Sequence, residues 1–393
     1  MRIEVLLDLK TRLGESPVWD VEQQRLWWVD SLDGRLFACN AQGGAIKSWD
    51  VRQKIGSFAL RQSGEGAVVA LQNGVHLLDF ASGELTLLHH PEADRPFNRL
   101  NDGKVDRQGR FLFGSMDMRE EEPSGALYRL DPDLSLHVLK KDIIVSNAPC
   151  WSPSGETFYF ADTWTGEICA WDYNTATGDL SGERVFCHVD RSEGGAADGA
   201  TVDSEGYLWN ALVYAGKLVR YTPEGKVDRI IEMPVKKVTS VMFGGENLDV
   251  LYVTSMAQPP LPRFPEDNQL RGSLFAIYDL GVTGVAERRA AERRGGKPGA
   301  CHVWRRQLAL LLPAGAARRH PANDLLGKIF YRRPHQHALS AYRQPGVDAP
   351  GDAGKQPCRQ RRRDEDLFTH PAQPQYFADG GQYPADANRL YGH

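Results

Sequence analysis

Short apolar segments separated by polar turns make up most of the chain, and their layout recurs. Each copy begins with a short apolar stretch, passes a turn rich in Asp, Ser and Gly, and continues into aromatic and β-branched residues. Such segments, bounded by Gly, Asp, Asn and Pro, are typical of β-strands, and no sustained helical period occurs before Ala286. The copies begin at Ser16, Phe58, Gly103, Pro149 and Ala200, with a weaker sixth copy at Val238.

The spacing of these copies indicates the architecture. They recur about every 40–50 residues, which is the period of a four-stranded propeller blade. Six copies therefore predict an all-β fold, a six-bladed β-propeller over residues 1–287. A β-sandwich or another all-β meander is the alternative, but the regular spacing favours the propeller. Residues 1–10 form a short apolar run with acidic residues inside it, and we expect it to be a strand that pairs with the last blade and closes the ring.

Charge divides the chain at the end of the repeats. Residues 1–287 contain 28 Lys and Arg against 42 Asp and Glu, whereas residues 288–393 contain 19 against 9. This second segment is rich in Arg, Pro, Ala, Gly and Gln, a composition that predicts disorder or weak structure. We therefore treat residues 288–393 as a basic C-terminal tail. The tail has three interpretations. In order of preference, it is an out-of-frame translation, a disordered extension, or an arm that binds nucleic acid or an acidic partner.

The remaining composition bears on compartment and partners. The six cysteines show neither CxxC spacing nor a dense framework, so reduced thiols in a cytoplasmic protein are expected. The N-terminal run is too short and too acidic for a signal peptide or a membrane span. Because no nucleic-acid-binding fold is evident, we expect a small-molecule partner and a monomer or small homo-oligomer, with no membrane association.

Four short motifs near the starts of the repeats combine carboxylates with amides. A propeller brings equivalent positions of its blades to one central axis, where two carboxylates and an amide make an oxygen-rich cation site. The motifs are Gly14-Glu15-Ser16-Pro17, Asn101-Asp102-Gly103, Ser146-Asn147-Ala148-Pro149 and Ala197-Asp198-Gly199.

From about residue 3 to 287 the chain resembles the senescence-marker-protein (regucalcin), gluconolactonase and luciferin-regenerating-enzyme family. No single motif is specific, but the order and spacing of the set are. Besides the four motifs above, the resemblance rests on Leu26-Trp27-Trp28-Val29-Asp30, Ile55-Gly56-Ser57, Arg99-Leu100, Trp151-Ser152-Pro153-Ser154-Gly155 and Gly272-Ser273-Leu274-Phe275-Ala276.

The resemblance implies a six-bladed propeller that hydrolyses sugar-acid lactones with one divalent cation at its centre. By matching motif, Glu15, Asn147 and Asp198 would be the metal ligands, and Arg99 and Asn101 would contact substrate oxygens, with Asn101 close to the ion. The acidic substrate contact of the family falls among Met116–Glu121, where several carboxylates compete. The family's usual ending is absent after Val285, which puts closure of the ring in question.

The chemistry of lactone hydrolysis is consistent with these residues. A divalent cation (Ca²⁺, Mg²⁺, Mn²⁺ or Zn²⁺) supplies a Lewis acid for the carbonyl or the attacking water. Asp198 would serve as the catalytic general base, ionised at neutral pH beside the cation, and Arg99 and Asn101 would donate hydrogen bonds to the developing oxyanion.

Each residue also has a structural interpretation. Glu15 would then be a solvated turn carboxylate, Asn147 and Asp198 would be turn residues, and Arg99 would form a surface ion pair. Asp106 and Asp203 lie in strand–strand turns, where capping is expected. At the level of the protein, the hypothesis is a lactonase acting on an aldonic-acid lactone such as gluconolactone. The alternative is a propeller that binds calcium or a protein without turnover.

Overall fold

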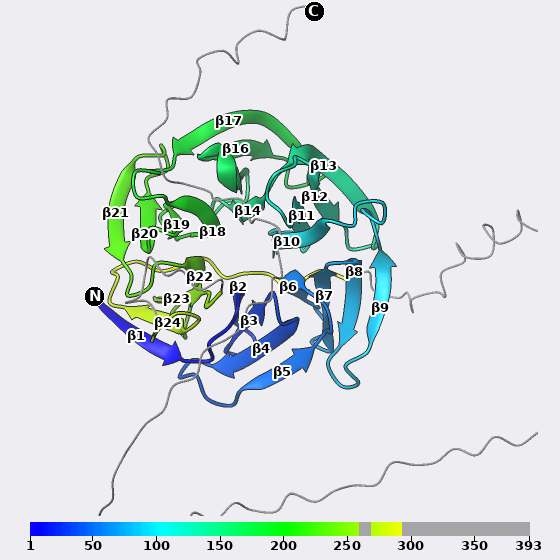
Figure 1. The fold of residues 1–393 in the computed structure, drawn as a ribbon, viewed down its shortest axis with the longest axis horizontal. Helices are drawn as coiled ribbons and strands as arrows, with labels where there is room; N and C mark the ends of the chain where they lie inside the picture. The colour runs from blue at the N-terminus through cyan, green and yellow to red at the C-terminus, as the bar shows by residue number, and fades with distance from the viewer. Residues whose placement is uncertain (259–268, 293–393) are drawn as a thin grey trace, which may run out of the picture. The chain divides into compact units, whose positions relative to one another are not determined.

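The computed structural model describes residues 1–258 and 269–292, which form six four-stranded antiparallel sheets around one axis (Figure 1). This confirms the predicted six-bladed β-propeller. The tail predicted from residue 288 lies outside the described residues from 293 onward.

Each blade is an antiparallel sheet whose strands follow one another in space, with the first strand innermost. In the last blade the outermost strand comes from the N-terminus of the chain. Blades 1 and 2 consist of β2 (Gly14–Asp20), β3 (Arg25–Asp30), β4 (Arg35–Asn40) and β5 (Lys47–Asp50), then β6 (Ile55–Leu60), β7 (Gly66–Leu71), β8 (Gly74–Asp79) and β9 (Leu85–His89). Blades 3 and 4 consist of β10 (Asn98–Val105), β11 (Phe111–Asp117), β12 (Gly125–Leu130) and β13 (Leu136–Ile143), then β14 (Ser146–Trp151), β15 (Thr157–Asp162), β16 (Glu167–Tyr173) and β17 (Leu180–His188), with the 3₁₀ turn η1 (Thr163–Thr165) after β15. Blades 5 and 6 consist of β18 (Ala196–Val202), β19 (Leu208–Val213), β20 (Lys217–Tyr221) and β21 (Val227–Glu232), then β22 (Val238–Gly244), β23 (Val250–Ser255), β24 (Leu274–Tyr278) and β1 (Arg2–Leu7).

Burial decreases from the axis outward. Every residue of β6, β10 and β18 is buried, whereas β5 and β21 are largely exposed and β9 is half-buried to exposed. The hydrophobic cores lie between neighbouring blades, as where Trp19 of blade 1 stacks on Tyr252 of blade 6 with ring centroids 5.7 Å apart. Adjacent blades cover both faces of each inner sheet region, and the strands there can therefore be apolar along their whole length.

The N-terminal strand closes the ring, as predicted. β1 pairs antiparallel with β24, with Arg2 opposite Tyr278 and Ile3 opposite Ile277. Both ends of the propeller thus meet in one sheet, and the altered sequence after Val285 leaves this closure intact.

Two aspartates cap their blade turns, as expected. One carboxylate oxygen of Asp106 accepts the backbone N–H groups of Gln108 and Arg110, and one of Asp203 accepts those of Glu205 and Tyr207. Such capping satisfies backbone donors that the tight turn leaves unpaired.

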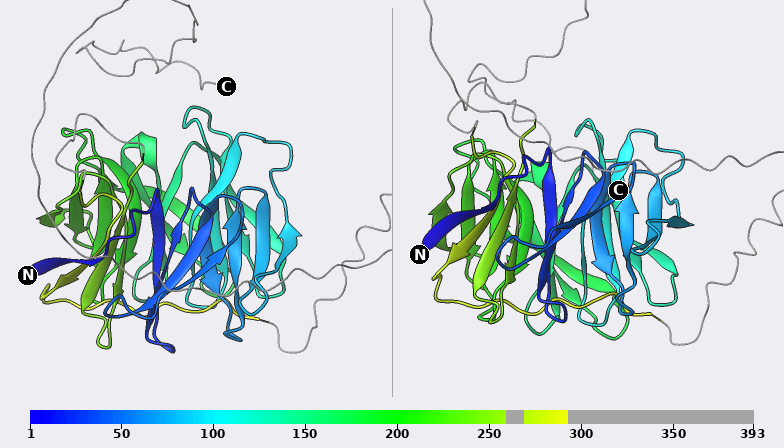
Figure 2. Two further views of the ribbon diagram at one scale, coloured as in Figure 1. Left: turned by 60° about the horizontal axis from the view of Figure 1, so that its bottom comes forward. Right: turned by 90° about the horizontal axis from the view of Figure 1, so that it is seen from below.

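Residues 283–292, here called the closing segment, run across one face of the propeller (Figure 2, yellow). The segment begins at the turn after β18, where Gly284 pairs with Asp203. It ends beside β6 and the turn after β10, where Ala290 N–H donates to Leu60 O and Ala291 N–H to Gly109 O. The closing segment therefore bridges blade 5 to blades 2 and 3, and its last five residues lie beyond the predicted boundary at 287.

No helix long and apolar enough to cross a membrane occurs among the described residues.

Candidate active site

A bulge interrupts each of the six innermost strands. The hydrogen-bond register shifts on β2 between Glu15 and Val18, on β6 between Ile55 and Ser57, on β10 between Leu100 and Gly103, on β14 between Asn147 and Cys150, on β18 between Ala197 and Ala200, and on β22 between Val238 and Ser240. A bulge re-aims side chains that a regular strand would direct into a sheet face. The four carboxylate and amide motifs lie at these bulges, so they are strand residues close to the axis and not loop tips (Figure 1).

Backbone conformation explains how two of the bulges turn. Ser16 and Ala148 directly follow Glu15 and Asn147, and they have φ angles of 48° and 60°. Residues other than glycine rarely adopt positive φ, and doing so costs about 1–3 kcal/mol that the surrounding structure must offset. The backbone is therefore held in a strained turn next to two of the predicted ligands.

All five predicted site residues are buried. Glu15, Arg99, Asn101, Asn147 and Asp198 each expose less than a tenth of their surface. The interpretations of Glu15 as a solvated turn carboxylate and of Arg99 as a surface ion pair are therefore wrong. A buried charge requires a partner, and the arrangement of these residues indicates which partners are present.

A chain of hydrogen bonds links Arg99 to β18. Nη1 of Arg99 donates to Oδ1 of Asn101 at 2.6 Å, and Nδ2 of Asn101 donates to Oδ1 of Asn147 at 3.1 Å. Nδ2 of Asn147 then donates to Thr163 Oγ1 at 2.8 Å, and that hydroxyl donates to Ala197 O at 2.9 Å. The structure thus brings Asn101 against Asn147, and it fixes the amide of Asn147 next to the backbone that carries Asp198.

The two predicted carboxylate ligands repel each other. Burial, followed by the negative charge of Asp102, raises the pKa of Glu15, while Arg99 opposes this shift. Burial, followed by the charges of Glu15 and Asp102, raises the pKa of Asp198 well above the ordinary range. The expected ionisation of Asp198 at neutral pH refers to the cation-bound site and stays a prediction.

The donor chemistry of this site fits a hard divalent cation. Neither Glu15 nor Asp198 has a basic nitrogen within 4.0 Å among the described residues, and the charge of Arg99 acts on both carboxylates from farther away. Two carboxylates and the Asn147 amide offer the oxygen ligands that Ca²⁺ or Mg²⁺ prefer. Within residues 1–258 and 269–292 no group of three or more His, Cys, Asp or Glu is arranged to hold a metal, and the predicted set contains only two such side chains.

The structure distinguishes the acidic residues between Met116 and Glu121. The buried carboxylate of Asp117 accepts backbone N–H groups of Arg119, Glu121 and Glu122, which makes it a cap for this loop. Glu120 is exposed, and its Oε2 accepts the indole N–H of Trp164 at 2.9 Å. The charge of Glu120 also acts on Arg99 and Asp198. Glu120 is therefore the carboxylate of this loop that faces the site, with Trp164 beside it.

Sequence reasoning missed three residues at this site. Thr163 orients Asn147, Trp164 holds Glu120, and Asp102 accepts hydrogen bonds from Ser16 Oγ at 3.3 Å and Ala148 N at 3.1 Å. Asp102 lies inside a quoted motif, so its carboxylate was visible as a signal. Thr163 and Trp164 lie in η1, for which the repeat pattern gave no signal.

Comparisons with known proteins show which family the chain belongs to. Residues 13–257 match the family model described as the SMP-30/Gluconolactonase/LRE-like region. Regucalcin of Xenopus laevis is 34% identical over 292 residues, covering 73% of this chain and 97% of that protein. The 6-deoxy-6-sulfogluconolactonase of Pseudomonas putida is 35% identical over 277 residues, covering 70% and 94%. The solved structure of regucalcin from Agrobacterium tumefaciens, described as a calcium-binding protein, has a TM-score of 0.68 and 29% identity, covering 73% of this chain and 96% of that one. The chain belongs to the SMP-30/gluconolactonase/LRE-like family.

Proposed function

We propose that this protein hydrolyses an aldonic-acid lactone, such as gluconolactone, to the open-chain acid with the help of one divalent cation. The observation that carries the proposal is the pair of buried carboxylates, Glu15 and Asp198: the charge of Glu15 acts on Asp198, and neither has a basic nitrogen within 4.0 Å among the described residues. Membership of a family that includes lactonases supports the reaction class, and the Pseudomonas putida relative is named for a sugar-acid lactone.

Glu15, Asn147 and Asp198 would hold the cation. When bound, the cation supplies Lewis-acid polarisation of the carbonyl or of the attacking water. Asp198 accepts the proton of that water as the new C–O bond forms, and the ring C–O bond then breaks. The same carboxyl group returns the proton to the departing alkoxide, so that acid and alcohol are released and Asp198 is regenerated.

Arg99 and Asn101 orient the substrate in this scheme. Both hydrogen bonds that Arg99 donates to described residues use Nη1, and a guanidinium carries five N–H donors in all. The remaining donors would stabilise the carbonyl oxygen as it becomes negative. Glu120, next to Trp164 at the mouth, is placed to accept hydrogen bonds from sugar hydroxyl groups.

Hydrolysis of D-glucono-1,5-lactone by the cation-stripped chain tests the proposal. Acid release would be followed above the spontaneous rate, before and after addition of Ca²⁺, Mg²⁺, Mn²⁺ or Zn²⁺. We expect at least one cation to restore turnover and Asp198→Asn to abolish it, while Asp249→Asn, in an exposed turn, remains active. Cation binding without turnover on glucono-, galactono- and pentonolactones would instead support the non-catalytic calcium-binding propeller.

A further inference from the structure

Lys54 lies at the mouth of the candidate site. It directly precedes β6, and Glu15 and Arg99 likewise lie at the beginnings of β2 and β10. These three strands are neighbours around the axis (Figure 1), and the first halves of β6 and β10 are joined where Ser57 Oγ donates to Asn101 O at 2.7 Å. Lys54 therefore lies at the same end of the inner strands as the predicted ligands.

Within the part of the chain that the structure describes, the ammonium group of Lys54 has no anionic partner. Its Nζ lies 3.1 Å from the thioether sulfur of Met118, which is a weak hydrogen-bond acceptor. Among the described residues no carboxylate comes within 4.0 Å of Nζ. The side chain is partly buried, so its charge has lost part of its hydration without gaining a counter-ion.

Other cations surround Lys54. Burial lowers the pKa of Lys54, and the charges of Arg99 and Arg12 lower it further. Arg12 is already paired with Asp33 at 2.9 Å, and Arg99 is balanced by Glu15, Glu120 and Asp198. Among the described residues Lys54 therefore carries a positive charge without an ion pair, and the loop that contacts it through Met118 also carries Glu120, which is hydrogen-bonded to Trp164.

We propose that the lactone accepted by this protein carries an anionic group on the carbon farthest from its ring ester, and that Lys54 binds this group. The inference rests on the proposed function and narrows its substrate class to lactones of acidic sugars bearing a carboxylate, sulfonate or phosphate ester. An anion at this point supplies the partner that Lys54 lacks among the described residues, and hydrogen bonds in which donor or acceptor is ionised are roughly twice as strong as those between neutral groups. The neutral hydroxyl groups then face Glu120 and Trp164, which fixes the direction in which the sugar enters.

Two lactones that differ only at the terminal carbon test the proposal. D-Glucaro-1,4-lactone has a carboxylate where D-glucono-1,4-lactone has a hydroxymethyl group. We expect the wild-type protein to prefer the charged lactone by about tenfold in kcat/KM. Lys54→Gln should remove this preference by raising KM for the charged lactone, whereas Lys54→Arg should retain it. Lys47→Gln on the exposed strand β5 controls for the change in net charge.

A binding measurement separates this proposal from the proposed function. Titration calorimetry with D-glucarate and D-gluconate needs no turnover, and we expect glucarate to bind about tenfold more tightly, a difference that Lys54→Gln removes. If neither lactone is hydrolysed but this binding difference is found, the proposed function is wrong and the anion site stands. Equal binding of the two acids, or a preference that Lys54→Gln leaves unchanged, would overturn the anion site.

Discussion

Asp102 is a buried carboxylate whose hydrogen bonds converge on the backbone behind the predicted ligands. Its Oδ2 accepts Ala148 N–H at 3.1 Å, and its Oδ1 accepts Gly103 N–H at 2.8 Å and Ser16 Oγ–H at 3.3 Å. Ser16 and Ala148 are the two residues with positive φ that follow Glu15 and Asn147. The position of Asp102 therefore favours the strained turns that direct these two side chains, and its charge adds negative potential at the site.

On the proposed function, Asp102→Asn should weaken cation affinity by about 10–100-fold, because groups behind metal ligands contribute at this level. The dissociation constant for Ca²⁺ would be measured by calorimetry on stripped protein. Asparagine keeps the size of the side chain but only one of its two acceptor oxygens, so the melting temperature without cation would be measured beside the affinity to separate lost backbone hydrogen bonds from lost charge. An unchanged dissociation constant would mean that Asp102 only satisfies backbone donors.

At the scale of the element, the bulges of β18 and β22 are packed face to face. A methyl group added to Gly199 would lie 2.0 Å from Ser240 Oγ and 2.8 Å from Ser240 Cα. This contact leaves no room for a side chain, and Cα, being backbone, cannot rotate away. The close approach of the two blades therefore requires glycine at position 199, independently of the role of Asp198 beside it.

Gly199→Ala should accordingly lower the free energy of unfolding by about 1–3 kcal/mol, the usual cost of overpacking a core. Urea denaturation of the cation-free protein would measure it. Gly44→Ala, which meets only the flexible side chain of Asn40 at 3.1 Å, is the matched control. Equal stability of the two variants would show that blades 5 and 6 separate without cost.

The same elements show what the sequence allowed us to predict. The blades were predictable because their strand–turn–strand pattern is local. The positions of Glu15, Asn147 and Asp198 on the inner strands follow from motifs near the starts of the repeats, whereas their role as ligands comes from the family resemblance and stays a prediction. Glu120, Thr163 and Trp164 were not assigned, because each follows the second strand of a blade and its direction depends on how that connection packs. Arg288–Glu292 were assigned to the tail because their composition is basic. Composition alone does not indicate that a segment docks on the propeller.

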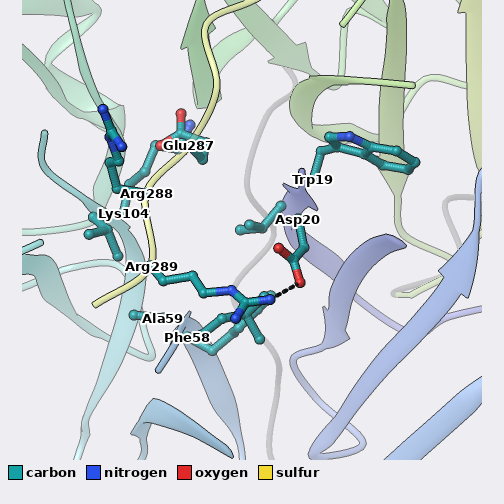
Figure 3. A pocket seen from close by; sticks show the side chains of 11 residues that line it. Trp19, Asp20, Phe58, Ala59, Lys104, Glu287, Arg288 and Arg289 are labelled. Atoms are coloured by element: carbon teal, nitrogen blue, oxygen red, sulfur yellow. Dashed lines mark hydrogen bonds and ion pairs between the residues drawn. The ribbon is translucent and has the colours of Figure 1, made fainter. Parts of the chain in front are cut away.

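At the scale of the whole molecule, two different sets of contacts stabilise the closed ring. β1 closes it through strand pairing, and the closing segment ties blade 5 to blades 2 and 3 on the face opposite the site. Figure 3 shows Arg289 of this segment directed at Asp20 at the end of β2, with 2.6 Å between Nη2 and Oδ2. A cavity of about 20 Å³ lies beside this pair, enough for roughly one water molecule. The Asp20 carboxylate is 1% exposed, so Arg289 supplies charge to an otherwise buried anion.

Arg289→Met should therefore lower the free energy of unfolding by about 3 kcal/mol, because it leaves the Asp20 carboxylate buried without its cation. Arg288 precedes it in the same segment but is exposed, so Arg288→Met should change stability by less than about 0.5 kcal/mol. Asp20→Asn combined with Arg289→Met should recover part of the loss, since no charge then stays unpaired. Turnover per folded molecule should be the same in all three variants, because Asp20 lies five residues, or roughly 17 Å of strand, from Glu15. Urea denaturation curves measured beside lactone hydrolysis separate these effects, and equal destabilisation by the two single arginine variants would show that the closing segment acts through its net charge and not through the Asp20 contact.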